Sequence, residues 1–298
     1  MRVTPKLLST LVLAAFIAQP TLAEELTGTL KKIKDSGRIV VGVRDASQPF
    51  SYLLNDKQYV GYSVDLCNKV VDSVKKQLKL SALSVIYQPV TSQTRIPLMQ
   101  NGTIDLECGS TTNSMERQKQ VAFGNNMFWV NVRMAVKANS SIKGLADLNG
   151  KPVVTTTGTT SDRYIKQHEV GSKIDVKNLY GKDHDESFLM LETDRAAAFV
   201  MDDTLLAAKI ANSRNPADFA IVGEILSGEP YGIMLRKDDP QFKKAVDDAL
   251  NAVYKSKEIY NIYAKWFQSP IPPKGLNLRM PMSDKLKALF DNPNDKGA

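Results

Sequence analysis

The chain has 298 residues, of which 43% are hydrophobic and 24% charged, and its formal net charge is +7. This length predicts about two domains. Each would be large enough to bury a hydrophobic core without the help of disulfides or metal ions. The composition excludes a disordered chain, and no heptad or Gly-X-Y repeat is sustained. Outside the N-terminus no apolar run approaches the roughly 18 residues of a membrane span. Two cysteines are too few for a disulfide scaffold or a four-cysteine zinc site.

The first 23 residues have the order of a secretory signal peptide. Arg2 and Lys6 precede an apolar stretch at 7–18, and small residues follow at 20–23. The stretch is too short for a membrane anchor, so we expect an exported chain that begins at Glu24. Removing Arg2 and Lys6 from the 39 basic residues leaves 37 against 32 acidic ones. This excess is spread along the chain, which argues against nucleic acid as a partner and suits a small anionic ligand.

Strand and helix patterns alternate along the first half of the chain in a β-α-β-α-β order. Short apolar runs predict buried strands at 38–43, 85–87 and 104–108. Helical spacing of apolar residues at 64–78 and a short segment at 95–100 predict the helices between them. This order indicates a parallel sheet covered by helices.

The same order restarts in the middle of the chain. We expect a strand at 152–156, a helix at 162–168, and a strand that ends at Asp202 and leads into a helix through Ile210. Two apolar stripes between 242 and 266 predict C-terminal helices, which a polar, Pro-rich tail follows. Two α/β units place the default ligand pocket in the cleft between them, beyond the carboxyl ends of the strands.

The residues directly after the predicted strands are rich in arginines and hydroxyl groups. The principal ones are Arg44, Arg95, Arg117, the Gly-Thr-Thr-Ser run at 158–161, His184 and Asp202. A planar guanidinium group matches the two oxygens of a carboxylate, and a helix start offers N–H groups to an anion. A single arginine after a strand is more often a surface ion pair, but several at one end of the sheets indicate a carboxylate site.

Several segments together resemble family 3 of the bacterial solute-binding proteins. They are RIVVGVR at 38–44, PFSY at 49–52, GYSVDL at 61–66, TSQTRIPL at 91–98, NGTIDLECGSTTN at 101–113, GTTS at 158–161, KDH at 182–184, AFVMDD at 198–203 and YGIMLRKDDPQFKK at 231–244. The resemblance covers essentially the whole mature chain. Within the family, the motifs resemble those of the periplasmic members that bind glutamate and aspartate for an ABC importer.

The resemblance implies a two-lobed α/β fold of the type II periplasmic binding proteins, each lobe being a mostly parallel sheet flanked by helices. One lobe would comprise 24–131 and 232–298, and the other 132–231, with the ligand in the cleft between them. It also implies a periplasmic monomer that captures L-glutamate or L-aspartate and delivers it to an inner-membrane ABC permease. Catalysis, a cofactor, a metal and nucleic acid are not part of this expectation.

The resemblance assigns part of the site to the groups that every amino acid carries. Arg117, with Ser110 and Thr112, would hold the α-carboxylate, and Thr160 at the helix start would add to it. Asp202 would pair with the α-ammonium group.

The remaining residues would surround the side-chain carboxylate: Arg44, Ser92, Arg95 and His184. Charge counting agrees, because two carboxylates and one ammonium group need at least two cationic subsites and one anionic subsite. The charges do not rank glutamate against aspartate. Two states of His184 stay open: an imidazolium formed beside the bound anion, or a neutral ring that donates one hydrogen bond.

Three other interpretations compete with this one. A metal site at His184 is disfavoured, because the adjacent Asp183, Asp185 and Glu186 cannot all face one ion. An exported dehydratase or lyase on the same fold would use Glu107 as a general acid, although Glu107 as the partner of an arginine is the simpler reading. A purely sensory amino-acid-binding module is the third alternative.

Cys67 and Cys108 are the only cysteines. An exported chain permits their pairing, but the spacing alone does not bring their Cα atoms within reach of a disulfide. Two buried free thiols are therefore the favoured expectation, and a disulfide stays open as the alternative.

Overall fold

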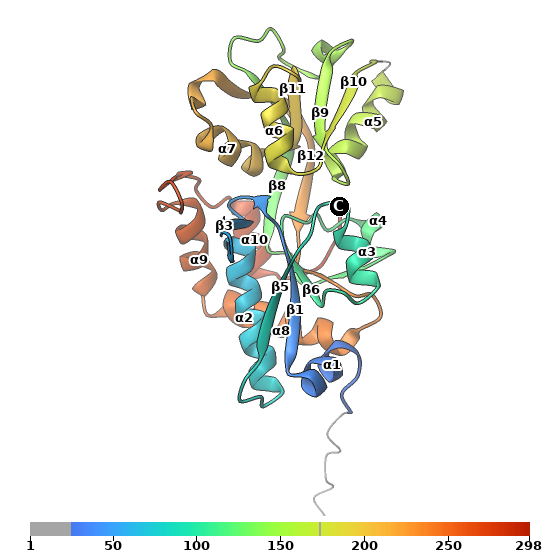
Figure 1. Ribbon diagram of the computed structural model, residues 1–298, viewed down its shortest axis with the longest axis vertical. Helices are drawn as coiled ribbons and strands as arrows, with labels where there is room; N and C mark the ends of the chain where they lie inside the picture. The colour runs from blue at the N-terminus through green and yellow to red at the C-terminus, as the bar shows by residue number, and fades with distance from the viewer. Residues whose placement is uncertain (1–24, 173) are drawn as a thin grey trace, which may run out of the picture.

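Two five-stranded sheets form the framework of the computed structural model, which describes residues 25–172 and 174–298 (Figure 1). The predicted signal peptide at 1–23 lies outside the described residues. The first sheet has the order β5-β1-β6-β13-β7. Its strands are β1 (Arg38–Val43), β5 (Ser84–Pro89), β6 (Leu106–Cys108), β7 (Ala122–Phe123) and β13 (Met234–Leu235). The strand β1 runs parallel to β5 and β6, whereas β13 is antiparallel to β6 and β7.

The second sheet has the order β10-β9-β11-β8-β12. Its strands are β8 (Phe128–Lys137), β9 (Pro152–Thr156), β10 (Lys177–Gly181), β11 (Ala198–Asp202) and β12 (Phe219–Tyr231). The strand β9 is parallel to β10 and β11, and β8 is antiparallel to β11 and β12. Each sheet therefore contains parallel strands, which helical crossovers connect. It also contains antiparallel strands, which the chain adds when it returns to the sheet.

Helices cover both sheets (Figure 1). Those of the first half and the C-terminal region are α1 (Gly28–Ser36), α2 (Tyr62–Gln77), α3 (Arg95–Gln100), α4 (Met115–Gln118), α8 (Pro240–Lys255), α9 (Glu258–Phe267) and α10 (Asp284–Asp291). Those between β8 and β12 are α5 (Thr160–Ser172), α6 (His184–Glu192) and α7 (Asp203–Asn212), with short 3-10 turns at Leu145–Leu148 and Pro216–Asp218. Within the described part of the chain, none of the helices is long and apolar enough to cross a membrane.

Two features were not expected from the sequence. A small antiparallel sheet, β2 (Ala46–Ser47), β3 (Ser51–Asn55) and β4 (Gln58–Val60), follows β1. The polar, Pro-rich tail contains the helix α10, which the sequence analysis did not predict. Leu286 and Phe290 of α10 are buried, and the Ser283 side chain caps its N-terminus. An eight-residue helix with only two buried apolar residues carries too weak a periodic pattern to be recognised.

The long strands β8 and β12 carry the chain between the two halves of the molecule (Figure 1). They pair from Phe128 with Tyr231 to Lys137 with Phe219, with an irregularity between Val222 and Ser227. The proposed lobe boundary at 131–132 falls inside β8, because one continuous strand makes the crossing. Where β8 begins and β12 ends, the rings of Phe128 and Tyr231 pack edge-on against Phe50, with centroids 4.8 and 5.1 Å away.

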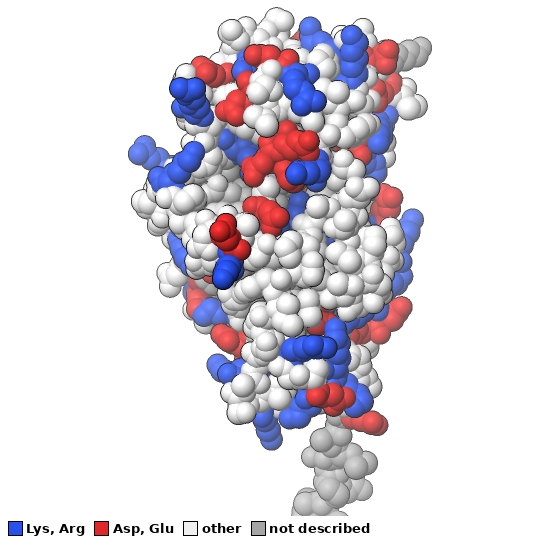
Figure 2. Space-filling view, viewed as in Figure 1, with Lys and Arg blue, Asp and Glu red and all other residues white. Residues whose placement is uncertain are grey.

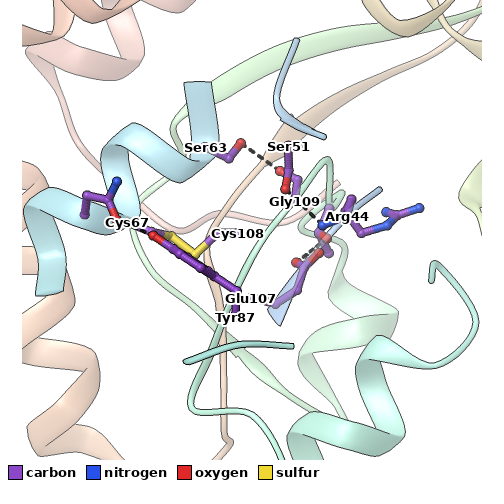
Figure 3. The surroundings of a disulfide bond; sticks show 10 residues. Arg44, Ser51, Ser63, Cys67, Tyr87, Glu107, Cys108 and Gly109 are labelled. Atoms are coloured by element: carbon purple, nitrogen blue, oxygen red, sulfur yellow. Dashed lines mark hydrogen bonds between the residues drawn. A yellow bond between two sulfur atoms is a disulfide. The ribbon is translucent and has the colours of Figure 1, made fainter. Parts of the chain in front are cut away.

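A disulfide joins Cys67 on α2 to Cys108 at the end of β6, with 6.2 Å between their Cα atoms (Figure 3). The expectation of two free thiols is therefore wrong. Both residues are almost completely buried, because α2 packs its apolar face directly on the sheet. This packing brings together two positions that are 41 residues apart, which the spacing in the sequence does not reveal.

Candidate functional site

Three arginines lie buried at the carboxyl ends of the first sheet. Arg44 follows β1 directly, Arg95 opens α3 after β5, and Arg117 belongs to α4 after β6. Their exposed fractions are only 2%, 2% and 7%. The expectation that strand ends gather these side chains holds, because β1 lies between β5 and β6 in the sheet.

Among the described residues, the three guanidinium groups bond to neutral oxygens and not to carboxylates. Arg44 Nη2 donates to Ser92 Oγ at 2.9 Å, and Arg95 Nη1 donates to the Thr111 hydroxyl at 2.6 Å and to the Ser110 carbonyl at 3.4 Å. Arg117 Nη1 donates to the Thr112 carbonyl at 2.9 Å.

Elsewhere in the described residues, the arginines that form ion pairs are Arg163 and Arg236. A buried cation without a direct counter-ion is costly. The three arginines of the site therefore favour an anionic ligand.

Burial weakens the protonated state of all three arginines. Burial, and then the charge of Arg95, lower the pKa of Arg44 to about 10 and that of Arg117 to about 9. Burial also lowers the pKa of Arg95, which the charge of Glu107 partly offsets. All three remain cationic at neutral pH, and a bound anion would relieve their mutual repulsion.

The second sheet supplies three further residues from the ends of its strands. Thr160 opens α5 after β9, His184 opens α6 after β10, and Asp202 ends β11. All three are nearly inaccessible to solvent. They meet the first sheet's residues directly, because Thr160 Oγ1 lies 3.4 Å from Thr112 Oγ1, and the charges of Arg44 and Arg95 both act on His184. The structure thus brings all nine predicted site residues together.

Five of these nine residues have a buried polar atom without a hydrogen-bond partner among the described residues. The atoms are Arg44 Nη1, Arg95 Nε, Ser110 Oγ, His184 Nε2 and Asp202 Oδ1. Buried polar atoms are normally paired. Their concentration at the junction of the two sheets makes this cluster the candidate site for a polar ligand.

Two buried glutamates belong to the cluster, and the sequence indicated only one of them. Glu107, which was weighed as a general acid, accepts a 2.5 Å hydrogen bond from the Thr111 hydroxyl that also binds Arg95. Glu229 on β12 was missed, because it does not follow a strand. One oxygen of Glu229 accepts from Thr112 at 2.5 Å and from Thr160 at 2.8 Å. The charge count based on Asp202 alone was therefore incomplete.

Asp202 lies in the same acidic part of the cluster. Burial, and then the charge of Glu229, raise its pKa well above the ordinary value of 3.8. The Tyr231 hydroxyl donates to Oδ2 of Asp202, and Oδ1 has no partner in the described chain. A cationic group placed at this oxygen would stabilise the charged carboxylate.

A chain of hydrogen bonds fixes which nitrogen of neutral His184 carries the proton. The Ser187 hydroxyl donates to the Asp183 carbonyl at 2.8 Å, so it accepts from Thr156 at 2.8 Å. The Thr156 hydroxyl therefore accepts from His184 Nδ1 at 2.9 Å. The neutral ring then has its proton on Nδ1, and Nε2 is a bare acceptor. Burial, and then the charge of Arg44, lower the His184 pKa well below 6.5.

The two halves of the molecule are closed over the cluster. Arg117 Nη2 donates to the Gly158 carbonyl at 3.2 Å. At Gly158, with φ at +80°, a Cβ atom would lie 2.8 Å from the Cα of Gln93.

An open groove follows the outer edge of the junction and lies beside the cluster. It is lined by residues that include Asp45, Leu53, Asp185 and Leu189. Figure 2 shows acidic and basic side chains gathered near this junction.

The comparisons with known proteins agree with the geometry. The profile of the bacterial extracellular solute-binding proteins, family 3, matches residues 39–269. The L-glutamate/L-aspartate-binding protein of Pseudomonas aeruginosa is 54% identical and aligns over 100% of this chain and 99% of its own length. The glutamate/aspartate import solute-binding protein of Escherichia coli is 50% identical, over 96% and 95%.

A solved structure also matches. An ancestral arginine-binding protein bound to arginine is 32% identical, with a TM-score of 0.70, over 78% of this chain and 98% of its own. The two-lobed α/β fold expected from the sequence is thereby confirmed. The chain belongs to family 3 of the bacterial extracellular solute-binding proteins.

Proposed function

We propose that this chain is a periplasmic solute-binding protein that captures L-glutamate and L-aspartate as a monomer and delivers them to an inner-membrane ABC importer. The observation that carries the proposal is the set of three buried arginines, whose partners in the described part of the chain are all neutral oxygens. A ligand with two carboxylates supplies the missing counter-ions, and its ammonium group suits Asp202. The names of the relatives from Pseudomonas aeruginosa and Escherichia coli, which are 54% and 50% identical, support the same ligands.

The groups common to all amino acids bind between Arg117 and Asp202. Arg117 and Ser110 hold the α-carboxylate, to which the N–H groups at the start of α5, including that of Thr160, also point. The hydroxyl protons of Thr112 and Thr160 are both donated to Glu229. Thr112 therefore offers the ligand a lone pair and no proton. We reassign its hydroxyl from the α-carboxylate to the α-ammonium group, which lies beside Asp202.

The side-chain carboxylate binds among Arg44, Ser92, Arg95 and His184. Arg44 Nη1, Arg95 Nε and His184 Nε2 are the atoms of this group without a partner in the described chain. Arg44 and Arg95 come from the first sheet and His184 from the second. A carboxylate between them would tie the two halves together, so closure depends on the ligand.

Glu107 serves in this proposal to hold Arg95 through the Thr111 hydroxyl. In a dehydratase or lyase, the carboxyl group of Glu107 would instead have to donate its proton to the substrate. Incubation of the protein with glutamate, followed by chromatography, distinguishes the two roles. We expect the ligand to be recovered unchanged, and a new product would establish the enzyme.

Calorimetry of the ligand-stripped mature protein tests the proposed ligands. We expect glutamate and aspartate to bind, and glutamine to bind more weakly by roughly 2–5 kcal/mol, because its amide leaves a buried arginine without its charged partner. The variant Arg95→Met is the matched test, since it is expected to weaken glutamate binding more than glutamine binding. Equal affinities for glutamate and glutamine in the wild-type protein would contradict the proposal.

A further inference from the structure

The last five described residues, 294–298, lie extended against the segment that carries Arg117. Figure 1 places this end of the chain beside α4, at the level where the two halves meet. We call residues 294–298 the strap. The helix α10 anchors the strap, because its Leu286 and Phe290 are buried in the core. The family profile ends at residue 269, so the strap lies beyond the segment that defines the family.

Among the described residues, six hydrogen bonds to the main chain of the strap hold it in place. An ion pair of 3.0 Å between Lys243 and the Asp295 side chain adds to them. Ala298 exchanges two 3.0 Å bonds with the loop before α4, donating to the Asn113 carbonyl and accepting from the Met115 N–H. Asn126 donates from its main chain to the Asn294 carbonyl at 2.8 Å and from its side chain to the Lys296 carbonyl at 2.9 Å.

The remaining two bonds go to one carbonyl of the strap. The amide groups of Asn113 and Gln118 both donate to the Asp295 carbonyl, at 2.9 and 2.8 Å. The same two side chains also bond to each other at 2.8 Å. Because Asn113 and Asn126 are buried, with exposed fractions of 0% and 2%, removal of the strap would leave their donors unsatisfied.

The strap lies too close to the loop for any side chain at Gly297. A Cβ atom there would lie 2.8 Å from the Met115 nitrogen and 2.9 Å from the Ser114 carbonyl carbon. Both are main-chain atoms, so they cannot give way by changing a rotamer. The side chain of Lys296, in contrast, is exposed.

The loop that the strap holds lies between two residues of the site. Thr112 precedes Asn113, and its carbonyl accepts the bond from Arg117 Nη1. The Ser114 side chain accepts from the Arg117 N–H and caps α4. A shift of residues 113–116 would therefore move Thr112 and Arg117 relative to each other.

We propose that the strap is a positioning segment, which holds residues 113–116 so that Arg117 and Thr112 are preorganised for an amino-acid ligand. The inference rests on the proposed function of the site. Without the strap, the loop has to be ordered when the ligand binds, and this conformational entropy reduces the affinity.

The test compares three variants with the full chain by calorimetry. Truncation after Pro293 and the substitution Gly297→Val both displace the strap, and we expect the Kd for glutamate to rise on the order of tenfold. Lys296→Ala is the matched control, because it keeps every main-chain bond, and we expect it to leave the Kd unchanged. An unchanged Kd in the truncated chain would overturn the proposal.

Rescue in trans separates positioning from a general loss of stability. A synthetic peptide of residues 292–298 is expected to restore glutamate affinity to the truncated protein. By linkage, saturating glutamate then raises the affinity for the peptide by the same factor. A truncated chain that stays weak when the peptide is bound would show that the strap only stabilises the fold, and this would overturn the inference.

Amide hydrogen exchange keeps the inference distinct from the proposed function. A full chain that binds neither glutamate nor aspartate would refute the proposed function. Exchange at Met115, whose N–H donates to Ala298, and at Arg117 still reports on the strap. We expect both to lose protection in the truncated chain, and unchanged protection would refute the positioning role.

Discussion

The hydroxyl groups around Glu229 decide what the acidic part of the site offers to a ligand. A threonine hydroxyl has one proton, and both Thr112 and Thr160 give theirs to the same carboxylate oxygen. Because these threonines come from opposite halves of the molecule, Glu229 also links the halves through a residue of the crossing strand β12. Through these bonds Glu229 orients two neighbours, and this requires no contact with a ligand.

The variant Glu229→Gln tests this orienting role. The amide keeps the shape of the side chain and loses its charge, so two charge-assisted hydrogen bonds become neutral ones. We expect glutamate binding to weaken by about 1–2 kcal/mol. The pKa of Asp202 is expected to fall, because the charge of Glu229 raises it. Calorimetry measures the first effect, and Glu224→Gln, an exposed position on the same strand, is the control that is expected to behave as wild type.

The tautomer of His184 leads to a pH dependence of binding. In the ligand-free protein the pKa of His184 is below 6.5, so the ring is neutral and Nε2 carries no proton. A carboxylate at Nε2 favours the imidazolium, so glutamate binding takes up a proton. Affinity therefore falls as pH rises between the free-state and bound-state pKa values, by at most about tenfold per pH unit.

Calorimetry in buffers of different ionisation enthalpy measures this proton uptake directly. The charged groups that act on the ring are those of Arg44, Lys209 and Arg95. His184→Gln is expected to abolish the uptake, whereas an equal pH slope in both proteins would refute the proton-linked binding. The pKa of His184 is lower in the folded chain than in the unfolded chain, so the unfolded chain binds a proton first. The ligand-free protein therefore also loses stability as pH falls below about 6.5.

At the scale of elements, the disulfide ties α2 to the strand that leads into the site. Figure 3 shows Cys108 next to Glu107 and Gly109, close to Arg44. Beside the disulfide, the hydroxyl group of Ser63 on α2 donates a 2.8 Å hydrogen bond to the Gly109 carbonyl. The end of β6 is thus attached to α2 by a covalent bond and by a hydrogen bond, which fixes where the loop of the candidate site starts.

Reduction of the disulfide tests its contribution to stability. The cross-link spans 41 residues, and loop-closure entropy predicts a loss of about 4 kcal/mol in the free energy of unfolding when it is broken. Urea denaturation with and without reductant measures this loss. The double variant Cys67→Ala/Cys108→Ala is the control and is expected not to respond to reductant. Identical midpoints for the reduced and oxidised wild-type protein would contradict the prediction.

At the scale of the whole molecule, the close approach of Gly158 to Gln93 allows the two halves to close. A side chain at Gly158 would collide with main-chain atoms of the opposite half. The exposed contact between Arg163 and Glu116 also crosses the junction, but an exposed ion pair contributes little. Closure therefore depends mainly on the buried contacts around the ligand.

Gly158→Ala and Gly150→Ala form a matched pair that isolates this contact. Both glycines have positive φ values, +80° and +73°, but a Cβ atom at Gly150 meets nothing within 4 Å. Both variants are expected to lose about 1–2 kcal/mol of stability from the backbone strain. Only Gly158→Ala is expected to weaken glutamate and aspartate binding, by at least tenfold, because it opposes closure. Small-angle scattering would then show no ligand-induced compaction, and wild-type affinity in this variant would refute the role.

The sequence by itself determined the alternating strands and helices and the polar residues that follow the strands. Short apolar runs and helical stripes record local burial, so α2, β9 and most other elements were predictable. Arg44, Arg95 and Asp202 were found because parallel strands end at one edge of a sheet. The motifs that resemble a known family then supplied the roles proposed for these residues.

Only the tertiary structure decided the features that depend on distant packing. The Cys67–Cys108 disulfide, the hydroxyls held by Glu229 and the strap beside α4 each join positions far apart in the chain. Neither periodicity nor spacing contains such distances, because both describe neighbours along the chain. The direction of a hydrogen bond, as at His184, also depends on every partner in its network. These contacts form only when the elements pack, so the sequence alone did not reveal them.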